Sequence, residues 1–128
     1  MLRRFLLLTL LAAAGCAARA DEPAPPAAPA EPCFYAEDVT GFRASSARVI
    51  YIATGGGLTV RAETYGDCRE ALSAQTLAVR THGAARVCRA GDADLFVSDG
   101  LSRRRCPIQR LHVLTAAEAA ALPRRDQP

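Results

Sequence analysis

The clearest hydrophobic pattern in this chain lies between residues 49 and 65 and predicts a β-hairpin. Residues 49–53 form an apolar run of β-branched and aromatic side chains, which is typical of a buried strand. Residues 55–57 are three glycines that indicate a turn, and residues 58–65 then alternate between apolar and polar. The apolar positions Leu58, Val60 and Ala62 share one face, because successive side chains of a strand point to opposite faces.

Shorter apolar runs separated by turn residues continue on both sides of this hairpin. They predict strands at 34–42, 76–81, 84–89, 94–98 and 108–113. His82-Gly83 and Gly91-Asp92 indicate turns between the middle three of these runs. About six short strands at this spacing favour a mainly β domain, built as a small antiparallel sheet or barrel.

Helix is expected only in short pieces. Thr115 and Glu118 form a capping box at the start of an alanine-rich turn that Pro123 ends, which predicts a short C-terminal helix. A similar single turn is predicted at residues 67–70. Residues 33–122 are therefore expected to be one β domain, and residues 123–128 a frayed tail.

The first 20 residues have the layout of an export signal. Arg3 and Arg4 give a positive start, residues 5–14 are an apolar run, and small residues follow. This run is too short to span a bilayer, which needs about 20 residues. We therefore predict that residues 1–20 are a signal peptide and that the chain is exported.

Two cleavage sites are compatible with this signal. Ala13-Ala14-Gly15-Cys16 resembles the bacterial lipobox, whose cysteine carries the lipid, although Ala13 stands where that pattern prefers leucine. Alternatively, Ala18-Arg19-Ala20 is an A-x-A site with cleavage before Asp21, which would give a soluble periplasmic protein. Residues 17–32 are rich in alanine, proline and acidic residues and are expected to be a disordered tether, which favours the lipoprotein. Ala17 after the lipidated cysteine implies the outer membrane.

Four cysteines remain in the domain once Cys16 is removed or lipidated, and an even number in an exported protein predicts disulfides. Three pairings of Cys33, Cys68, Cys88 and Cys106 are possible. We favour Cys68–Cys88 with Cys33–Cys106, because the second bond would join the first strand to the last and close the sheet. The cysteines contain no C-x-x-C, and His82 and His112 stand at no spacing typical of zinc ligands, so no metal and no other cofactor is expected.

Charge and aromatic content argue against nucleic acid as a partner. The formal net charge is +3, all basic residues are arginine, and there is no Trp. A nucleic-acid interface needs a clustered basic face and, for single strands, aromatic residues on which bases stack. No nucleic-acid binding is therefore expected.

The candidate sites in the domain are few. Arg103-Arg104-Arg105 is the densest charge, and three guanidinium groups on a loop could bind phosphate or carboxylate, although such runs also occur in solvated turns. Asp92, Asp94 and Asp99 lie close together, but their spacing is that of turns rather than of a calcium loop. No catalytic motif is present, Ser45, Ser46 and Ser98 have no base beside them in sequence, and the glycines at 55–57 do not form a phosphate loop.

The cysteine spacing and strand rhythm resemble one group of proteins. The segments Cys33-Phe34-Tyr35, Val39-x-Gly41-Phe42, Val87-Cys88-x-x-Gly91-Asp92 and Cys106-Pro107-Ile108, with Cys68 between them, resemble a family of small uncharacterised bacterial envelope proteins. That family is a domain of unknown function, and its members are often expected to be lipoproteins. The resemblance implies an envelope location and no activity.

These observations predict an exported envelope protein that is anchored to the membrane through Cys16 and is not an enzyme. Its partners would be the membrane and a further envelope protein or cell-wall component. Two alternatives stay open: a small periplasmic hydrolase with an unrecognised site, and a secreted protease inhibitor. A pocket at His82 or His112 would favour the hydrolase, a protruding rigid loop at residues 98–105 the inhibitor, and a flat sheet face a binding role.

Overall fold

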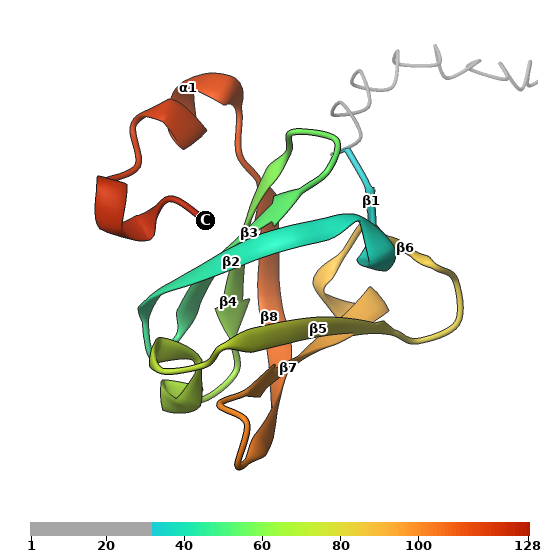
Figure 1. The fold of residues 1–128 in the computed structure, drawn as a ribbon. Coiled ribbons are helices and arrows are strands. Elements are labelled where there is room, and N and C mark those ends of the chain that lie inside the picture. The colour runs from blue at the N-terminus through green and yellow to red at the C-terminus, as the bar shows by residue number, and fades with distance from the viewer. Residues whose placement is uncertain (1–31) are drawn as a thin grey trace, which may run out of the picture.

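The structure, a computed structural model, describes residues 32–128. The expected signal peptide, Cys16 and nearly all of the expected tether lie outside these residues. The described part is mainly β, as predicted, with one six-stranded antiparallel sheet that curls into a half-barrel (Figure 1). The strands of this sheet, in spatial order, are β2 (Val39–Ser46), β3 (Val49–Thr54), β4 (Thr59–Thr64), β8 (Arg103–Val113), β7 (Ala93–Ser98) and β5 (Thr76–Thr81).

The hairpin predicted between residues 49 and 65 is confirmed as β3 and β4. Ile52 lies opposite Val60 and Ile50 opposite Ala62, and all four side chains are fully buried. Gly57 adopts φ +80° in the turn, a conformation that residues with a Cβ rarely adopt. The alternation of apolar and polar residues therefore sets which face of this hairpin enters the core.

The core fills the concave side of the sheet. Much of the core is formed by buried side chains of β3, β4, β7 and β8, including Ile50, Ile52, Val60, Leu95, Val97 and Ile108. In β7, Ala93, Leu95 and Val97 point inward, so Asp94, Phe96 and Ser98 point to the convex outer face. This alternation positions the candidate site described below.

Two disulfides cross-link the domain, but not in the pairing favoured from the sequence. Cys33 is bonded to Cys88, and Cys68 to Cys106. The prediction assumed that the first strand pairs with the last. Instead β8 lies in the middle of the sheet beside β4, so Cys68, just after β4, reaches Cys106.

The other disulfide flanks a small second sheet. Here β1 (Phe34–Tyr35) pairs with β6 (Arg86–Val87), and Cys33 and Cys88 lie opposite each other at one end of this pair. The expected single strand at 34–42 is thus interrupted by a 3-10 turn, η1 (Ala36–Asp38), before β2 begins. The expected strand at 84–89 is reduced to β6, and a 3-10 turn, η3 (Ala90–Asp92), precedes β7.

The short C-terminal helix is confirmed as α1 (Ala116–Ala120), with the expected capping box between Thr115 and Glu118. The single turn expected near Cys68 is the 3-10 helix η2 (Arg69–Leu72). The frayed tail is wrong: a further 3-10 turn, η4 (Arg124–Asp126), packs against β2 and buries Asp126. Pro128 lies against Gly41, where an added Cβ would be 3.7 Å from the Pro128 carbonyl carbon.

The half-barrel is open between its two edge strands, β2 and β5. No backbone hydrogen bond joins these strands in the described part of the chain. A groove of about 380 Å³ lies between them, lined by residues 39–42 of β2 and by residues 75–77 at the start of β5. None of the helices within residues 32–128 has the length and hydropathy that a membrane crossing needs.

Candidate functional site

The three arginines that stood out in the sequence lie on a strand and not in a loop. Residues 103–105 begin β8, so their side chains alternate between its two sides. Arg103 and Arg105 lie opposite Ser98 and Phe96 and therefore share the convex face of the sheet. Arg104 lies opposite the buried Val97 and points to the other side, where it remains exposed at the end of the barrel. The structure therefore places Arg103 and Arg105 on one face of β8 and Arg104 on the other.

Phe96 is the centre of the convex face. The guanidinium carbon of Arg103 lies over the Phe96 ring at 4.9 Å from its centroid, and that of Arg80, from β5, at 5.8 Å. Both distances are within the range of cation–π attraction, in which the negative face of the ring attracts the cation. The ring thus contacts one guanidinium group from β5 and one from β8.

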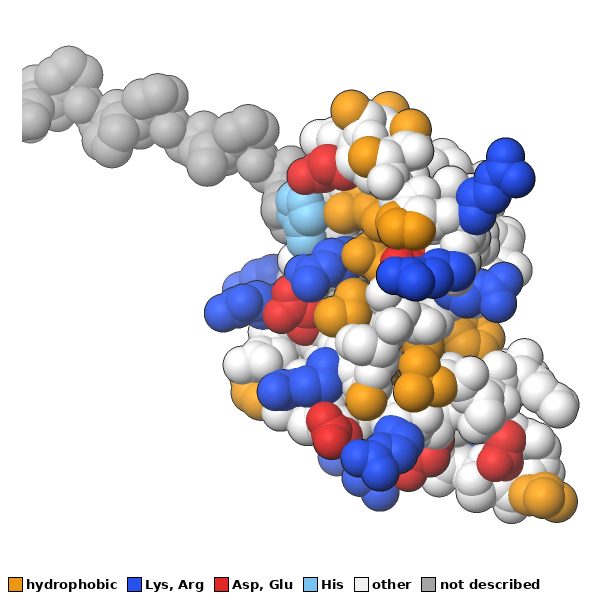
Figure 2. Space-filling model, turned by 90° about the vertical axis from the view of Figure 1, so that its left-hand side faces the viewer, with side chains coloured by type: hydrophobic (Ala, Val, Ile, Leu, Met, Phe, Trp, Pro, Cys, Tyr) orange, Lys and Arg blue, Asp and Glu red, His pale blue; other side chains and the backbone are white. Residues whose placement is uncertain are grey.

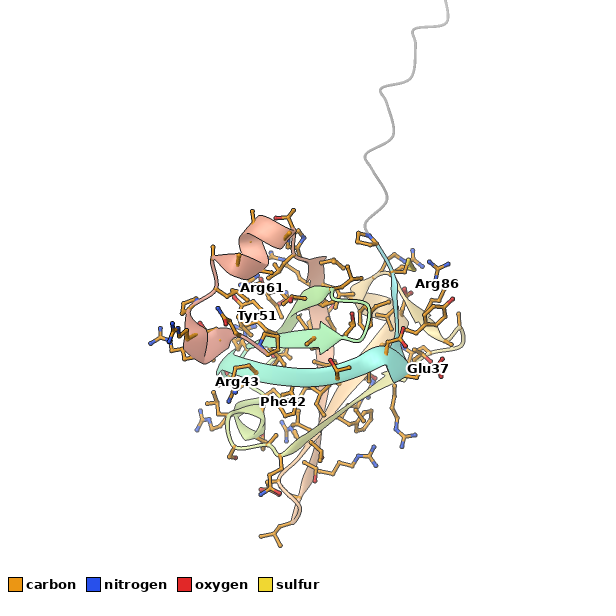
Figure 3. The ribbon with its side chains drawn as sticks, turned by 45° about the horizontal axis from the view of Figure 1, so that its top comes forward. Glu37, Phe42, Arg43, Tyr51, Arg61 and Arg86 are labelled. Carbon is orange, nitrogen blue, oxygen red and sulfur yellow. A yellow bond between two sulfur atoms is a disulfide. The ribbon has the colours of Figure 1, made fainter. Side chains whose placement is uncertain are left out.

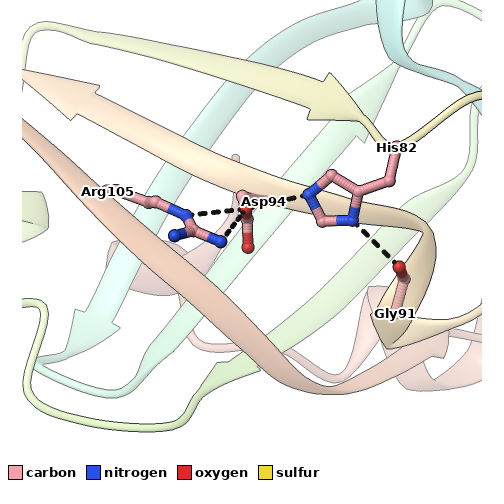
Figure 4. A network of polar contacts seen from close by, with 4 residues as sticks. All are labelled: His82, Gly91, Asp94 and Arg105. Carbon is pink, nitrogen blue, oxygen red and sulfur yellow. Dashed lines mark hydrogen bonds and ion pairs between the residues drawn. The ribbon is translucent and has the colours of Figure 1, made fainter.

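A buried carboxylate organises the neighbouring part of this face (Figure 4). The side chain of Asp94 is 7% exposed, and its Oδ2 accepts hydrogen bonds from Arg105 Nε at 2.7 Å and from His82 Nε2 at 2.9 Å. On the other side of the imidazole, His82 Nδ1 bonds to the Gly91 carbonyl oxygen at 3.1 Å. A buried carboxylate needs such partners, and here it has two cationic ones.

These bonds favour the charged form of His82. A carbonyl oxygen and a carboxylate can only accept, so His82 makes both bonds as an imidazolium that donates from both ring nitrogens. The hydrogen bond to Gly91, followed by the one to Asp94, raises the pKa of His82 above its ordinary value of 6.5. An imidazole with both nitrogens donating has no lone pair left to act as a general base.

The cavity beside His82 carries no nucleophile for a hydrolase. It measures about 290 Å³ and is lined by His82, Ala84, Arg86, Cys88 and Asp92. Cys88 is in a disulfide, and the Asp92 carboxylate accepts hydrogen bonds from the backbone N–H groups of Cys88 and Arg89. These bonds, that of Cys88 first, lower the pKa of Asp92. The geometry of this cavity gives no support to the hydrolase alternative.

The turn between β7 and β8 protrudes from the end of the barrel (Figure 1). Asp99 Oδ1 accepts hydrogen bonds from the backbone N–H groups of Leu101 at 2.9 Å and Ser102 at 2.8 Å, and from the Ser102 hydroxyl at 3.2 Å. The bond from the Ser102 backbone, followed by that from Leu101, lowers the pKa of Asp99. Leu101 is 99% exposed at this tip. A protruding loop, which would favour the inhibitor, is therefore present but is limited to residues 99–102. These residues form a tight turn and not the extended strand that a protease cleft would accept.

The three aspartates of the sequence analysis serve separate structural roles. Asp92 caps η3, Asp94 binds His82 and Arg105, and Asp99 closes the turn. Within residues 32–128, no group of three or more His, Cys, Asp or Glu side chains is arranged to hold a metal ion. His112 lies elsewhere, at the end of β8, with its Nε2 at 3.3 Å from Glu118 Oε2.

A second group of basic side chains lies near the C-terminal tail. Figure 3 shows Arg43, Tyr51 and Arg61 close together at this end of the sheet, with Arg86 on the far side of the domain. Arg61 is paired with Glu63, which also lies 3.6 Å from Arg110, so two of these arginines share one carboxylate. The face on the side of α1 carries acidic, basic and apolar side chains interspersed (Figure 2). The convex face of β5, β7 and β8 differs because two of its arginines lie over one aromatic ring, that of Phe96.

Sequence reasoning missed Arg80 and Phe96, which complete this face. Both lie on predicted strands, and their outward position follows from the alternation of those strands. What the sequence lacks is the pairing of β7 with both β5 and β8, which brings residues 80, 96 and 103 together.

Comparisons with known proteins support one part of the expected resemblance, the match to a family of unknown function. Neither curated proteins nor solved structures gave a match to this chain. A family model described as "Family of unknown function (DUF6491)" matches residues 1–127, nearly the full length. The match names no activity, and the lipoprotein character of the resembled group stays a prediction. The chain belongs to this family of unknown function, DUF6491.

Proposed function

We propose that this chain is an exported lipoprotein whose β domain is a non-enzymatic module that binds an anionic component of the bacterial envelope. Export is supported by the signal-like residues 1–20 and by the two disulfides, because such bonds form and persist in oxidising compartments. The lipobox-like sequence at Cys16 and the proline-rich residues 17–32 support an anchor followed by a tether.

The observation that carries the binding role is the pair of guanidinium groups, those of Arg80 and Arg103, held over the Phe96 ring. A free arginine loses rotamer freedom when it binds, and a side chain already resting on a ring loses less. Each guanidinium can still direct N–H groups toward solvent, where they can bind phosphate or carboxylate. We call Arg80, Phe96 and Arg103 the arginine–phenylalanine site.

The surrounding charges favour an anion at this site. The one carboxylate on the same face, Asp94, is buried and is already bonded to Arg105 and His82. It therefore competes little for Arg80 and Arg103. Below the raised pKa of His82, the face carries four cations against this single carboxylate, which favours a ligand with several anionic groups.

The experiment is a titration of the mature chain with inorganic polyphosphate at several salt concentrations. The expected result is salt-sensitive binding that the R80A/R103A variant weakens by about tenfold or more, since each charge-assisted contact is worth about 1.5 kcal/mol before solvent screening. The matched control is R69A/R124A, which removes the same two charges from exposed turns away from the site. Equal weakening in both variants would mean that only net charge matters, and would overturn the site.

A further variant isolates the role of the ring. Phe96→Leu keeps an apolar side chain but removes the ring face that attracts the two guanidinium groups. It should weaken polyphosphate binding by a few-fold while both arginines remain present. Binding unchanged in Phe96→Leu would show that the ring does not position them.

The location is tested separately by the intact mass of the protein recovered from membranes. A chain that starts at Cys16 and carries the mass of acyl chains is the expected result. A chain that starts at Asp21 without lipid would overturn the anchor and leave a periplasmic binding protein.

A further inference from the structure

The most exposed large apolar side chain of the described residues is Leu101, at the tip of the β7–β8 hairpin. It is 99% exposed, compared with 56% for Leu72, 66% for Tyr65 and 44% for Tyr35. Leu101 touches no core residue, so it contributes nothing to the packing of the domain. At the end of a projecting hairpin, this side chain can enter an apolar layer without any rearrangement of the domain.

The tip is held in this position by its own hydrogen bonds. Asp99 bonds to the backbone of Leu101 and Ser102, and Gly100 adopts φ +92°, which favours glycine. The pair Ser98–Arg103 closes the hairpin directly behind the turn. Leu101 is thus presented without the conformational freedom to fold back, which lowers the entropy lost when it binds.

Two arginines lie directly behind this apolar tip. Arg103 and Arg104 follow Leu101 by two and three residues, which is roughly 7 and 10 Å along a strand. Because they point to opposite sides of β8, they flank the hairpin with positive charge on both of its faces. The acidic residue of the turn, Asp99, directs its carboxylate into the turn, where it accepts three hydrogen bonds.

We propose that the β7–β8 tip docks on an anionic lipid surface, with Leu101 at the boundary of the acyl chains and with Arg103 and Arg104 at the headgroup phosphates. The spacing fits, because apolar side chains of interfacial segments enter about 5–10 Å into this boundary. Arginine stems can lie along the apolar layer while their guanidinium groups remain at the phosphates. The proposal rests on the proposed function, because it supplies the membrane as an anionic partner and shares Arg103 with the arginine–phenylalanine site.

The position of the tip is compatible with a second attachment of an anchored domain. The β7–β8 turn and the start of β1 lie at opposite ends of the domain (Figure 1). If a tether of residues 17–32 extended at about 3 Å per residue, its 16 residues would span about 48 Å, more than twice the radius of gyration of about 13 Å expected for a domain of this size. The domain could therefore turn its tip toward the membrane that holds its anchor. A weak contact is then enough, because tethering raises the effective concentration of the tip at the surface.

The test is flotation of the unlipidated mature chain, starting at Asp21, with two kinds of vesicle. One contains phosphatidylglycerol and phosphatidylcholine, and the other contains phosphatidylcholine alone. We expect salt-sensitive binding to the first and much weaker binding to the second. Leu101→Ser should weaken binding about tenfold, since it removes a buried leucine from the complex. Arg104→Ala should weaken it about fivefold, the effect of one cation near an anionic surface.

Matched controls separate the tip from general effects. Tyr35→Ser on β1 and Arg124→Ala on η4 remove one exposed apolar side chain and one exposed charge away from the hairpin, and should leave vesicle binding unchanged. Leu101 and Arg104 are exposed, so their variants should melt at the temperature of the unchanged chain. Binding that survives Leu101→Ser and Arg104→Ala, or that is equal for both vesicles, would overturn the proposal.

The two proposals fail in different ways. Arg80→Ala disrupts the arginine–phenylalanine site but lies at the far end of β5 from the tip, so it should weaken polyphosphate binding and leave vesicle binding intact. If the tip variants retain vesicle binding while Arg80→Ala loses polyphosphate binding, the lipid contact is wrong and the proposed function stands. If the unchanged chain binds neither polyphosphate nor anionic vesicles, the proposed function itself is wrong.

Discussion

Removal of either disulfide should destabilise this domain strongly, and by different amounts for the two bonds. The variants are C33A/C88A and C68A/C106A, each of which leaves the other bond intact. A domain of this size has a free energy of unfolding of about 5–15 kcal/mol. A change of a few kcal/mol is therefore a large part of the total.

The magnitude follows from the chain that each bond closes. The bonded residues are separated by 55 positions in Cys33–Cys88 and by 38 in Cys68–Cys106. In the chain-entropy description, loops of these lengths stabilise the folded state by about 4 kcal/mol each. Cys68 and Cys106 are also buried in the core at 2% exposure, whereas Cys33 is partly exposed. Loss of the buried sulfur atoms should add about 1 kcal/mol, so C68A/C106A should be the less stable variant although its loop is shorter.

The assay is urea unfolding of the unchanged chain and both variants, followed by circular dichroism, after peptide mapping without reducing agent. The expected map contains Cys33 joined to Cys88 and Cys68 joined to Cys106. The expected free energies of unfolding fall by about 4 kcal/mol for C33A/C88A and by about 5 kcal/mol for C68A/C106A. Peptides that join Cys68 to Cys88 would refute the topology, and a loss below about 1 kcal/mol in both variants would refute the loop-entropy reasoning.

Two further predictions concern the core and the charge of His82. Leu95→Ala should lower the free energy of unfolding by about 2–5 kcal/mol, because Leu95 is fully buried. Leu101→Ala should change it by less than about 0.5 kcal/mol, because Leu101 is exposed. Equal urea midpoints for the two variants would contradict this prediction. His82 has a pKa raised above its unfolded value of 6.5, so its stabilising effect is complete below about pH 6.5 and is lost as the pH rises through the folded pKa. The melting temperature of the unchanged chain should therefore fall more than that of His82→Gln over this range, and parallel curves would show that His82 does not act as an imidazolium.

The strands of this fold could be predicted where apolar runs or alternating side chains are bounded by turn residues. The predicted bounds of β3, β4, β5 and β7 agree with the structure within about one residue, from the apolar run of β3, the alternation of β4 and the turn residues that flank β5 and β7. The prediction was weaker where that signal was absent. Residues 103–107 are three arginines, a cysteine and a proline, and nothing in that composition indicates that β8 begins at Arg103 and continues to Val113.

The disulfide pairing and the C-terminal tail depend on contacts that no local pattern contains. Chain order suggested that the first and last strands meet, but β8 inserts between β4 and β7, and this places Cys106 beside Cys68. The polar residues 124–128 give no apolar periodicity, so they were expected to fray. In the structure η4 packs against β2, and Pro128 lies against the backbone of Gly41.

The candidate site shows how register converts a simple charge run into two surfaces. On a loop, Arg103, Arg104 and Arg105 would form one cluster of cations with nothing to hold them. On β8, alternation sends Arg103 and Arg105 to the convex face and Arg104 to the opposite side. The cross-strand neighbours then differentiate the first two, since Arg103 rests on Phe96 while Arg105 is bonded to Asp94. A shift of one residue in the β7–β8 register would exchange these environments. Leu95 and Val97 fix that register because their side chains are buried in the core. These two hydrophobic residues therefore also determine which arginine is available to a ligand.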